Sequence, residues 1–506
     1  MATRWAVASG NWSSTAIWNG GTLPAVDDDV YADGRTVTID QDVTAISLNT
    51  TQRSGGTNGG SFICTSNRTI NANIVAGGGV GLSITSPCTV VVNGSITGGT
   101  NSSIYGVRNT AVVNLTVNGT VTGGTATGAA GIHIADNGAS VFVINGNVIG
   151  GEGASCRGLQ TVASGTQSIT INGNVLGSVG SGLGEGIYIN SNGCSFNITG
   201  TLTARGNHAF QQLTGSSGVT CVITGDVYAS ATHGARYGIA IGGTGNFTVN
   251  GTAYGGSQAN GTGIYVSGNV TYTHNGNTVG GSGSSAYGIH IQANSATFTM
   301  NGNATGGSSG SGLLSNSPFT MTGNAIGGTA ANQVGVLANT SSGTITFTGN
   351  ATGGSATNTH GFHALSFTGT INFYGNATGG SGSNATGLLN GSSVATVNLY
   401  GDAIGGPNSA SFGAAVTSTG TLNVYGVARA STTTPAVNNN TGTGTLTVTQ
   451  AITGPTGMSP WTGNGPIFFN DLNMAYVTVN NSANTQRMLG RRMLAPLGSF
   501  EGGFNG

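Results

Sequence analysis

Charged side chains are scarce in this sequence. Only 5% of its 506 residues are charged, whereas an average soluble domain has about 25%. The 12 basic residues are all arginine, and the 13 acidic residues leave a net charge of −1. A chain with so few charges lacks the basic patch that binds nucleic acid or an anionic membrane, so we expect neither as a partner.

Long apolar runs are also missing. No stretch of about 18 apolar residues occurs, so we expect no transmembrane helix and no membrane insertion. The segment from Met1 to Trp12 has one arginine and no apolar core, so we expect no secretory signal. The 5 cysteines are odd in number and widely spaced, which argues against a disulfide framework and favours buried, reduced thiols.

Glycine is abundant instead, with 94 residues, yet 9 prolines and the absence of a Gly-X-Y period exclude collagen. A short strand-like run ending in Asn-Gly, Thr-Gly or Tyr-Gly recurs from Gly94 to Gly426. The thirteen intervals cover 332 residues, a mean of 25.5, and all but one lie between 25 and 27. The exception, 21 residues from Gly302 to Gly323, indicates a shortened loop.

The run before each of these glycines alternates, as a half-buried strand does. The residues four and two positions before the glycine are apolar, as in Phe142 and Ile144 before Gly146. The residue between them is mostly Thr, Asn or Val, and we expect it to face solvent. Only His274 interrupts the apolar columns, and we expect it to be a tolerated core residue rather than a base.

The residue immediately before the glycine is repeated in blocks of Asn, Thr or Tyr. Asparagine amides can hydrogen-bond along a stack of identical positions, and tyrosine rings can stack on one another. We expect the glycine that follows to adopt a positive φ at a sharp corner. The candidate structural ladders are Asn93, Asn118, Asn145, Asn172, Tyr374, Tyr400 and Tyr425.

Each repeat contains two further short strands, one closed by Gly-Gly and one that follows a variable loop, and no stretch favours a helix. This pattern predicts an all-β parallel β-helix, or β-solenoid, with three short strands in each of about 14–16 rungs of about 26 residues. The general preference for right-handed parallel connections predicts a right-handed coil.

The two ends of the chain differ from the repeats. Residues 1–60 hold three of the 4 tryptophans and six of the 13 acidic residues, which predicts an N-terminal cap or attachment region. We expect residues 61–453 to form the β-helix repeats. Residues 454–506 contain four of the 7 methionines and three arginines, residue types that are enriched at interfaces, and we expect a C-terminal cap or docking segment.

The first forty residues carry a set of recognisable motifs, which are Asn11-Trp12-Ser13, Ile17-Trp18-Asn19-Gly20-Gly21, Asp27-Asp28-Asp29-Val30 and Thr36-Val37-Thr38-Ile39-Asp40. This segment resembles the opening of bacterial and bacteriophage β-solenoid surface proteins that are fibre-like or spike-like. The resemblance implies a rod with a receptor-facing or scaffolding role, often as a homotrimer.

Carboxylates that could act as a catalytic pair are not clustered in the repeats. The acidic residues between positions 60 and 430 are Asp136, Glu152, Glu185, Asp226 and Asp402. No two of them in adjacent rungs share a column, so we expect no glycosidase or lyase site and no catalytic residue. Arg157 and Glu185 come from neighbouring rungs, and we expect a surface ion pair.

Histidines recur in two columns. His208 and His233 occupy equivalent positions in successive rungs, and we expect them to stack as part of a polar ladder. His133, His290 and His363 share another column in separated rungs. Two histidines without a nearby carboxylate or thiolate make a weak metal site, so we expect no metal and no cofactor.

These observations favour a non-enzymatic structural protein of a bacteriophage virion, a tail fibre, tailspike or capsid-attached fibre that is assembled in the host cytoplasm. Its expected partners are other virion proteins, bound through a terminal segment, a host surface glycan and further copies of itself. The alternative is a bacterial cell-surface adhesin. A glycan depolymerase with a site between subunits ranks third, and ice binding is disfavoured because the column after the corner glycine mixes Ser, Thr, Asn and Asp.

Overall fold

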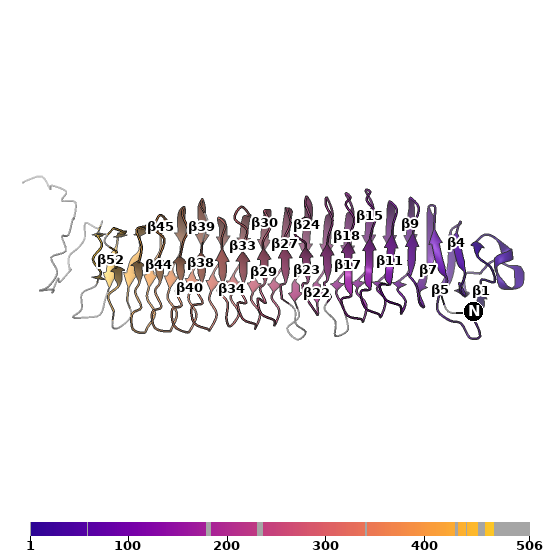
Figure 1. Ribbon diagram of the computed structural model, residues 1–506, viewed down its shortest axis with the longest axis horizontal. Coiled ribbons are helices and arrows are strands. Elements are labelled where there is room, and N and C mark those ends of the chain that lie inside the picture. Colours follow the sequence, from indigo (N-terminus) through magenta and orange to yellow (C-terminus); the bar gives the residue numbers. More distant parts are fainter. Residues whose placement is uncertain are drawn as a thin grey trace, which may run out of the picture.

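The chain folds into a rod, shown in the computed structural model of Figure 1, which describes residues 2–57, 59–178, 184–229, 236–339, 342–430, 434–441, 443–453 and 461–469. These residues form an all-β parallel β-solenoid of about 18 turns with rungs of about 25 residues, which confirms the predicted fold. At a strand spacing of about 4.8 Å, about 18 turns make a rod about 85 Å long. The right-handed sense of the coil stays a prediction.

The prediction of 14–16 rungs was too low. Turns that precede Gly94 and follow Gly426 continue the stacking without the Asn-Gly signature from which the rungs were counted. Four strands begin the rod: β1 (Thr3–Trp5), β3 (Asp29–Tyr31), β5 (Val43–Asn49) and β7 (Arg68–Val75). β7 pairs with both β9 and β10, so two of the three sheets described below are continuous at this end.

Sheet 1 contains the strands that lead to the corner glycines. Its strands pair in parallel with the equivalent strands one turn away, in unbroken register. They are β9 (Cys88–Val92), β12 (Val113–Val117), β15 (Val141–Ile144), β18 (Ser168–Asn172), β21 (Ser195–Thr199), β24 (Val219–Thr224), β27 (Gly245–Asn250), β30 (Val270–Asn275), β33 (Thr297–Asn301), β36 (Phe319–Thr322), β39 (Thr344–Thr348), β42 (Thr370–Tyr374), β45 (Thr396–Leu399), β48 (Thr421–Val424), β51 (Thr445–Val448) and β54 (Ile467–Phe469).

Sheet 2 contains the two- and three-residue strands that follow the corner. They are β10 (Ile96–Thr97), β13 (Val121–Thr122), β16 (Val148–Ile149), β19 (Val175–Leu176), β22 (Leu202–Ala204), β25 (Val227–Ala229), β28 (Ala253–Tyr254), β31 (Thr278–Val279), β34 (Ala304–Thr305), β37 (Ala325–Ile326), β40 (Ala351–Thr352), β43 (Ala377–Thr378), β46 (Ala403–Ile404), β49 (Val427–Arg429) and β52 (Ala451–Thr453).

Sheet 3 lies beyond the variable loops that project along one side of the rod in Figure 1. Its strands are β2 (Gly10–Asn11), β4 (Thr36–Ile39), β6 (Ser61–Cys64), β8 (Leu82–Ile84), β11 (Tyr105–Asn109), β14 (Ala130–Ile134), β17 (Arg157–Thr161), β20 (Ile187–Ile189), β23 (Phe210–Gln212), β26 (Ile239–Ile241), β29 (Ile264–Val266), β32 (Ile289–Ile291), β35 (Leu313–Ser315), β38 (Val336–Ala338), β41 (Phe362–Ala364), β44 (Leu388–Asn390), β47 (Ala414–Val416), β50 (Val437–Asn439) and β53 (Trp461–Thr462).

The apolar columns predicted from the alternation form the core. Every residue four or two positions before a corner glycine from Gly94 to Gly426 is at most 3% exposed. His274 is among them and is fully buried, where its Nε2 lies 3.1 Å from the backbone oxygen of Asn277. Burial of identical positions in successive turns joins the rungs into one continuous hydrophobic core.

Close packing between turns explains why the corner residue is always glycine better than a positive φ does. Seven of the fourteen, Gly276 and Gly302 among them, have φ between 136° and 157°, so a positive φ is not common to all. From Gly119 to Gly426, however, a Cβ would fall under 3.0 Å from the carbonyl oxygen of the corner glycine one turn earlier. Glycine is therefore required because the backbones of successive corners touch.

The N-terminal residues build the first turns of the rod and contribute to its core. Trp12 and Trp18 are each 2% exposed and pack edge to face, with ring centroids 4.9 Å apart. A 3₁₀ turn, η1 (Thr15–Ile17), lies between them in the sequence, and a second, η2 (Asn19–Gly21), follows Trp18. No α-helix occurs in the described ranges.

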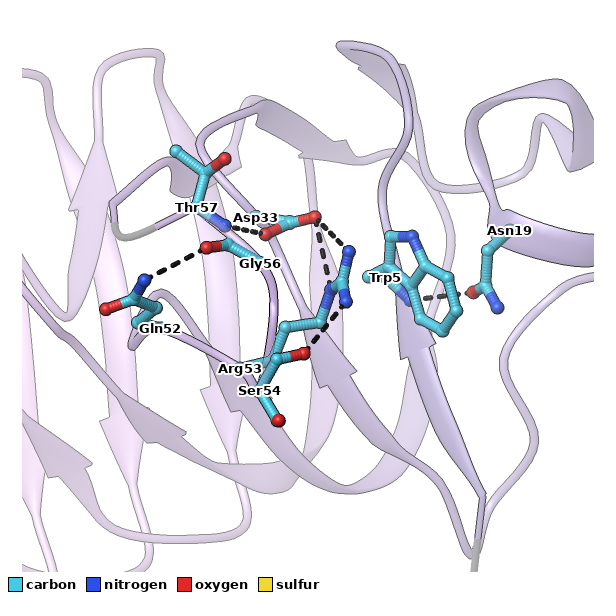
Figure 2. A network of polar contacts seen from close by, with 8 residues as sticks. All are labelled: Trp5, Asn19, Asp33, Gln52, Arg53, Ser54, Gly56 and Thr57. Atoms are coloured by element: carbon cyan, nitrogen blue, oxygen red, sulfur yellow. Dashed lines mark hydrogen bonds and ion pairs between the residues drawn. The ribbon is translucent and has the colours of Figure 1, made fainter.

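Ion pairs and ring contacts join the first turns to one another, as Figure 2 shows. Arg53 forms an ion pair with Asp33 at 2.9 Å, and its guanidinium lies 4.1 Å from the ring centroid of Trp5. Trp5 in turn donates its backbone N–H to Asn19 at 2.8 Å. Asp33, one of the acidic residues from which we predicted the N-terminal cap, thus helps to hold turns together.

Most of the predicted C-terminal segment, 454–506, lies outside the described residues. Its described part, 461–469, holds β53 and β54, which pair with β50 and β51 as further strands of sheets 3 and 1. Its expected docking role stays a prediction.

Candidate functional site

The outward face of sheet 1 carries an asparagine ladder along its edge. Each side-chain amide donates to the side-chain oxygen one turn earlier: Asn118 to Asn93 at 2.7 Å, Asn145 to Asn118 at 2.8 Å and Asn172 to Asn145 at 2.8 Å. The structure thus brings together the four predicted asparagines, and Asn93 itself donates to Asn71 at 2.6 Å. These hydrogen bonds link neighbouring turns and so stabilise the rod. Because the asparagines are exposed, the ladder also offers amide groups to solvent.

A second ladder, which the sequence analysis missed, follows the corner glycine. Here a side-chain oxygen accepts the backbone N–H of the equivalent residue one turn later, as Asn324 does from Asn350 and Asn350 from Asn376, both at 2.9 Å. Asp402 accepts in the same way from Val427 at 2.9 Å. The mixture of Ser, Thr, Asn and Asp in this column looked irregular, but Asn, Asp and Ser each supply a side-chain oxygen that accepts from the next turn, as Ser95 does from Thr120 at 3.2 Å.

The tyrosine ladder lies near the C-terminal end of sheet 1. The ring centroids of Tyr374 and Tyr400 are 4.6 Å apart, and those of Tyr400 and Tyr425 are 4.8 Å apart, with the planes within 7° of parallel. The three residues are 45%, 45% and 39% exposed. Partial burial, followed by the neighbouring rings of Tyr374 and Tyr425, raises the pKa of Tyr400.

An amide ladder runs beside these rings. Asn398 donates to Asn372 at 3.0 Å and Asn423 donates to Asn398 at 2.9 Å. Because the tyrosine faces are stacked on one another, the ladder presents ring edges and hydroxyl groups to solvent, and a face is open only at its two ends. A ligand on this surface would therefore meet hydrogen-bonding groups more than aromatic faces.

A second aromatic column lies on sheet 3 and its preceding loops. His208 stacks on Tyr237 with ring centroids 4.9 Å apart, and Tyr237 stacks on Tyr265 at 4.6 Å. The backbone N–H of Tyr237 also donates to Nδ1 of His208 at 3.3 Å. The predicted partner of His208, His233, lies outside the described residues.

The other three predicted histidines point outward from the middle of sheet-3 strands. His133, His290 and His363 share one register column, in which Arg108 precedes His133 and Tyr265 precedes His290. Burial lowers the pKa of His133 and of His290 to about 4, and that of His363 to about 3. For His133 the guanidinium groups of Arg108 and Arg157 lower the pKa further.

Arg157 and Glu185 form the predicted ion pair, with Nε and Oε2 2.9 Å apart. The pair is more buried than we expected, because Glu185 is only 5% exposed. The guanidinium of Arg157 also covers the ring of Tyr188 at 3.7 Å, and Glu185 accepts a hydrogen bond from Asn207 at 3.0 Å. These contacts hold neighbouring turns together, and Arg157 also donates to Gln160 of its own strand at 2.7 Å.

Other acidic side chains of the repeats are also engaged within the fold. Asp136 is 3% exposed and accepts from the hydroxyl of Ser140 at 2.8 Å. Asp226 accepts from the hydroxyl of Tyr228 at 3.0 Å, and Asp402 forms an ion pair with Arg429 at 3.3 Å. These carboxylates therefore serve packing and register where they lie.

The cysteines are all free thiols, and four of the five are buried. Burial raises the pKa of Cys64 to about 12. Cys194 lies 2.8 Å from the side-chain oxygen of Gln167 and 3.0 Å from the hydroxyl of Ser191. Within the ranges that the structure describes, no three His, Cys, Asp or Glu side chains are grouped to hold a metal ion.

Comparison of the chain with family models, with curated proteins and with solved structures finds no match. In the part of the chain that the structure describes, no helix is long and apolar enough to cross a membrane.

Proposed function

We propose that this chain is a non-enzymatic structural protein of a bacteriophage virion, a tail fibre, tailspike or capsid-attached fibre. In this role it is a rigid rod that contacts the host surface or serves as a scaffold. It is assembled in the host cytoplasm and acts as part of the virion.

The observation that carries the proposal is the unbroken rod with its surface ladders. About 18 turns stack in parallel, with a register shift between β5 and β7 and one hydrophobic core along the rod. Each turn is tied to the next by backbone pairing, by the asparagine ladder and by the acceptor ladder after the corner glycine. Such a rod keeps its ends at a fixed separation, which suits a fibre that has to hold a contact point away from a particle.

The N-terminal motifs support the surface-protein role by resemblance alone. The tryptophans of these motifs, Trp12 and Trp18, are buried in the first turns and pack edge to face. The partners that we propose are other virion proteins, bound through a terminal segment, and further copies of the chain.

A host surface glycan is the third proposed partner. Tyr374, Tyr400 and Tyr425 present hydroxyl edges beside the amides of Asn372, Asn398 and Asn423. Sugars are bound through hydroxyl groups, and a regular row of phenol and amide groups matches a repeating polysaccharide.

Quantitative mass spectrometry of purified particles and of the cell-free culture medium tests the proposal. We expect the chain in the particles at a fixed copy number, a few to tens for a tail fibre or spike and hundreds for a capsid fibre. Finding it only on host cells or free in the medium would reject the virion role and favour the cell-surface adhesin. Release of sugar ends from host polysaccharide by the purified protein would favour the depolymerase.

A further inference from the structure

One corner of the solenoid is shorter than its neighbours. Six positions separate Leu313, where a sheet-3 strand begins, from Phe319 in sheet 1. In the preceding turn, nine positions separate the register partners Ile289 and Phe298. The corresponding corner of the following turn also spans nine positions. Three of the residues that the 21-residue interval lacks are therefore missing from this corner.

The short corner leaves a notch between two longer ones. The notch has a volume of about 330 Å³. Asn294, Ser295 and Thr297 line it from the preceding turn, and Ser342 and Thr344 from the following turn, while the short corner supplies Pro318 and Thr320. Its volume lies near the lower end of the range of small-molecule sites, about 300–1,000 Å³.

Buried hydrogen bonds fix the shape of the short corner. The hydroxyl of Ser317 donates to the backbone oxygen of Ala293, and that of Ser315 donates to the backbone oxygen of Ser317 at 2.7 Å. The backbone N–H of Ser317 returns a bond to Ser315 at 3.1 Å. Both serines are fully buried, so the notch is formed before any ligand arrives, which lowers the entropic cost of binding.

The lining determines the class of ligand that fits. None of its eleven residues is ionisable, and most of the exposed ones carry a hydroxyl or amide group. The pyrrolidine ring of Pro318 adds one small apolar surface. A neutral ring with several hydroxyl groups and an apolar C–H face matches this combination, whereas a charged ligand would find no counter-ion.

We propose that this notch, lined by Asn294, Thr297, Pro318, Thr320 and Thr344, binds one neutral pyranose residue of a glycan. The inference rests on the proposed function, in which the rod meets a surface polysaccharide. It assigns a specific site on the rod for that contact.

The test uses the full-length protein and methyl glycosides of glucose, galactose, mannose, rhamnose and N-acetylglucosamine, with methyl glucuronide as the charged comparison. Saturation-transfer NMR and titration measure binding. We expect at least one neutral glycoside to bind and the glucuronide not to bind. Thr320→Tyr fills the notch and should weaken binding by about tenfold or more.

Two further variants separate loss of the site from loss of the fold. Thr248→Tyr places the same ring in the same outward column of sheet 1, outside the notch, and should leave binding unchanged. Replacing residues 316–318 with the longer corner sequence 292–297 closes the notch without a new aromatic ring and should abolish binding. Circular dichroism should show the same β-structure in all variants.

The proposal is overturned if none of the neutral glycosides binds, if Thr320→Tyr binds as tightly as the unmodified chain, or if Thr248→Tyr is equally impaired. Its failure is distinct from that of the proposed function. If particles that carry the Thr320→Tyr chain bind host glycan as well as unmodified particles do, the notch is rejected as the glycan site and the proposed role as a virion fibre stands. If glycosides bind at the notch but the chain is absent from particles, the notch stands as a binding site and the virion role is rejected.

Discussion

The side-chain amide of Asn118 donates to the side-chain oxygen of Asn93 at 2.7 Å, one turn earlier along the rod. Asn118 also accepts from Asn145 at 2.8 Å, so a single residue links three turns. Because each turn contacts only its neighbours, these links contribute directly to the interface between turns.

Asn118→Ala removes both hydrogen bonds, and we expect it to lower the free energy of unfolding by about 1–2 kcal/mol. Urea denaturation followed by circular dichroism measures the change. Asn197→Ala is the matched control, because Asn197 is an exposed sheet-1 asparagine whose side chain makes no hydrogen bond to any described residue. Equal losses in the two variants would contradict a stabilising ladder.

Gly302→Ala tests the close approach of the corner backbones. The added Cβ would collide with the carbonyl oxygen of Gly276. The backbone of Gly276 can move away only if the pairing between the two turns is disturbed. We expect a loss of about 2–4 kcal/mol in stability. At Gly79 the Cβ would lie 3.6 Å from the nearest atom, the oxygen of Gly60, so Gly79→Ala should be nearly neutral in the same denaturation experiment.

Tyr400 is stacked on both of its faces, so its replacement should affect two ring contacts. We expect Tyr400→Ala to cost about 1–3 kcal/mol in stability, and Tyr400→Phe to cost little because the rings still stack. The phenol also reports on its neighbours, since Tyr374 and Tyr425 help to raise the pKa of Tyr400. In Tyr374→Phe, ultraviolet titration should show the pKa of Tyr400 moving back toward its ordinary value; an unchanged titration would argue against the stack.

His274 should make the rod less stable in acid. Burial lowers the pKa of His274 from 6.5 to about 4. The unfolded chain therefore binds the proton first as the pH falls, so the contribution of the neutral histidine is complete above about pH 6.5 and is lost progressively toward about pH 4. That loss amounts to about 1.4 kcal/mol for each pH unit in this window.

His274→Met should reduce this pH dependence by one proton, because Met300 occupies the equivalent position one turn later. Urea denaturation at a series of pH values between 4 and 8 measures the slope. Thr273→Met, on the solvent side of the same strand, should leave the slope unchanged. A slope unaffected by His274→Met would show that His274 does not titrate in this range.

The sequence predicted the solenoid because its two strongest signals are local. Alternation around Phe142 and Ile144 reports which side of a strand is buried, and recurrence of the corner glycine reports the stacking of turns. The early turns were missed because their register depends on partners that vary in type, such as Arg53 with Asp33. Side-chain hydrogen bonds of this kind leave no repeating sequence signature.

The surface contacts were harder to predict than the core. His208 stacks on Tyr237, a pair that column counting did not suggest, because unequal loop lengths shift the residues that precede sheet 3. The notch at Pro318 depends on which corner loses residues, and the interval between glycines gives only the total loss. Placing that loss requires the register of sheets 1 and 3 together.

The parallel register of sheet 1, unbroken from β9 to β54, also lets the length of the rod change in regular steps. From β9 onward each sheet-1 strand pairs with its neighbours in the same parallel register, so adding or removing one whole repeat leaves the neighbouring pairings intact. Each such change alters the length by about 4.8 Å, one strand spacing. Gene duplication or deletion of single repeats can therefore adjust the distance between the two ends in fixed steps, while the surface carried by each turn is inherited unchanged.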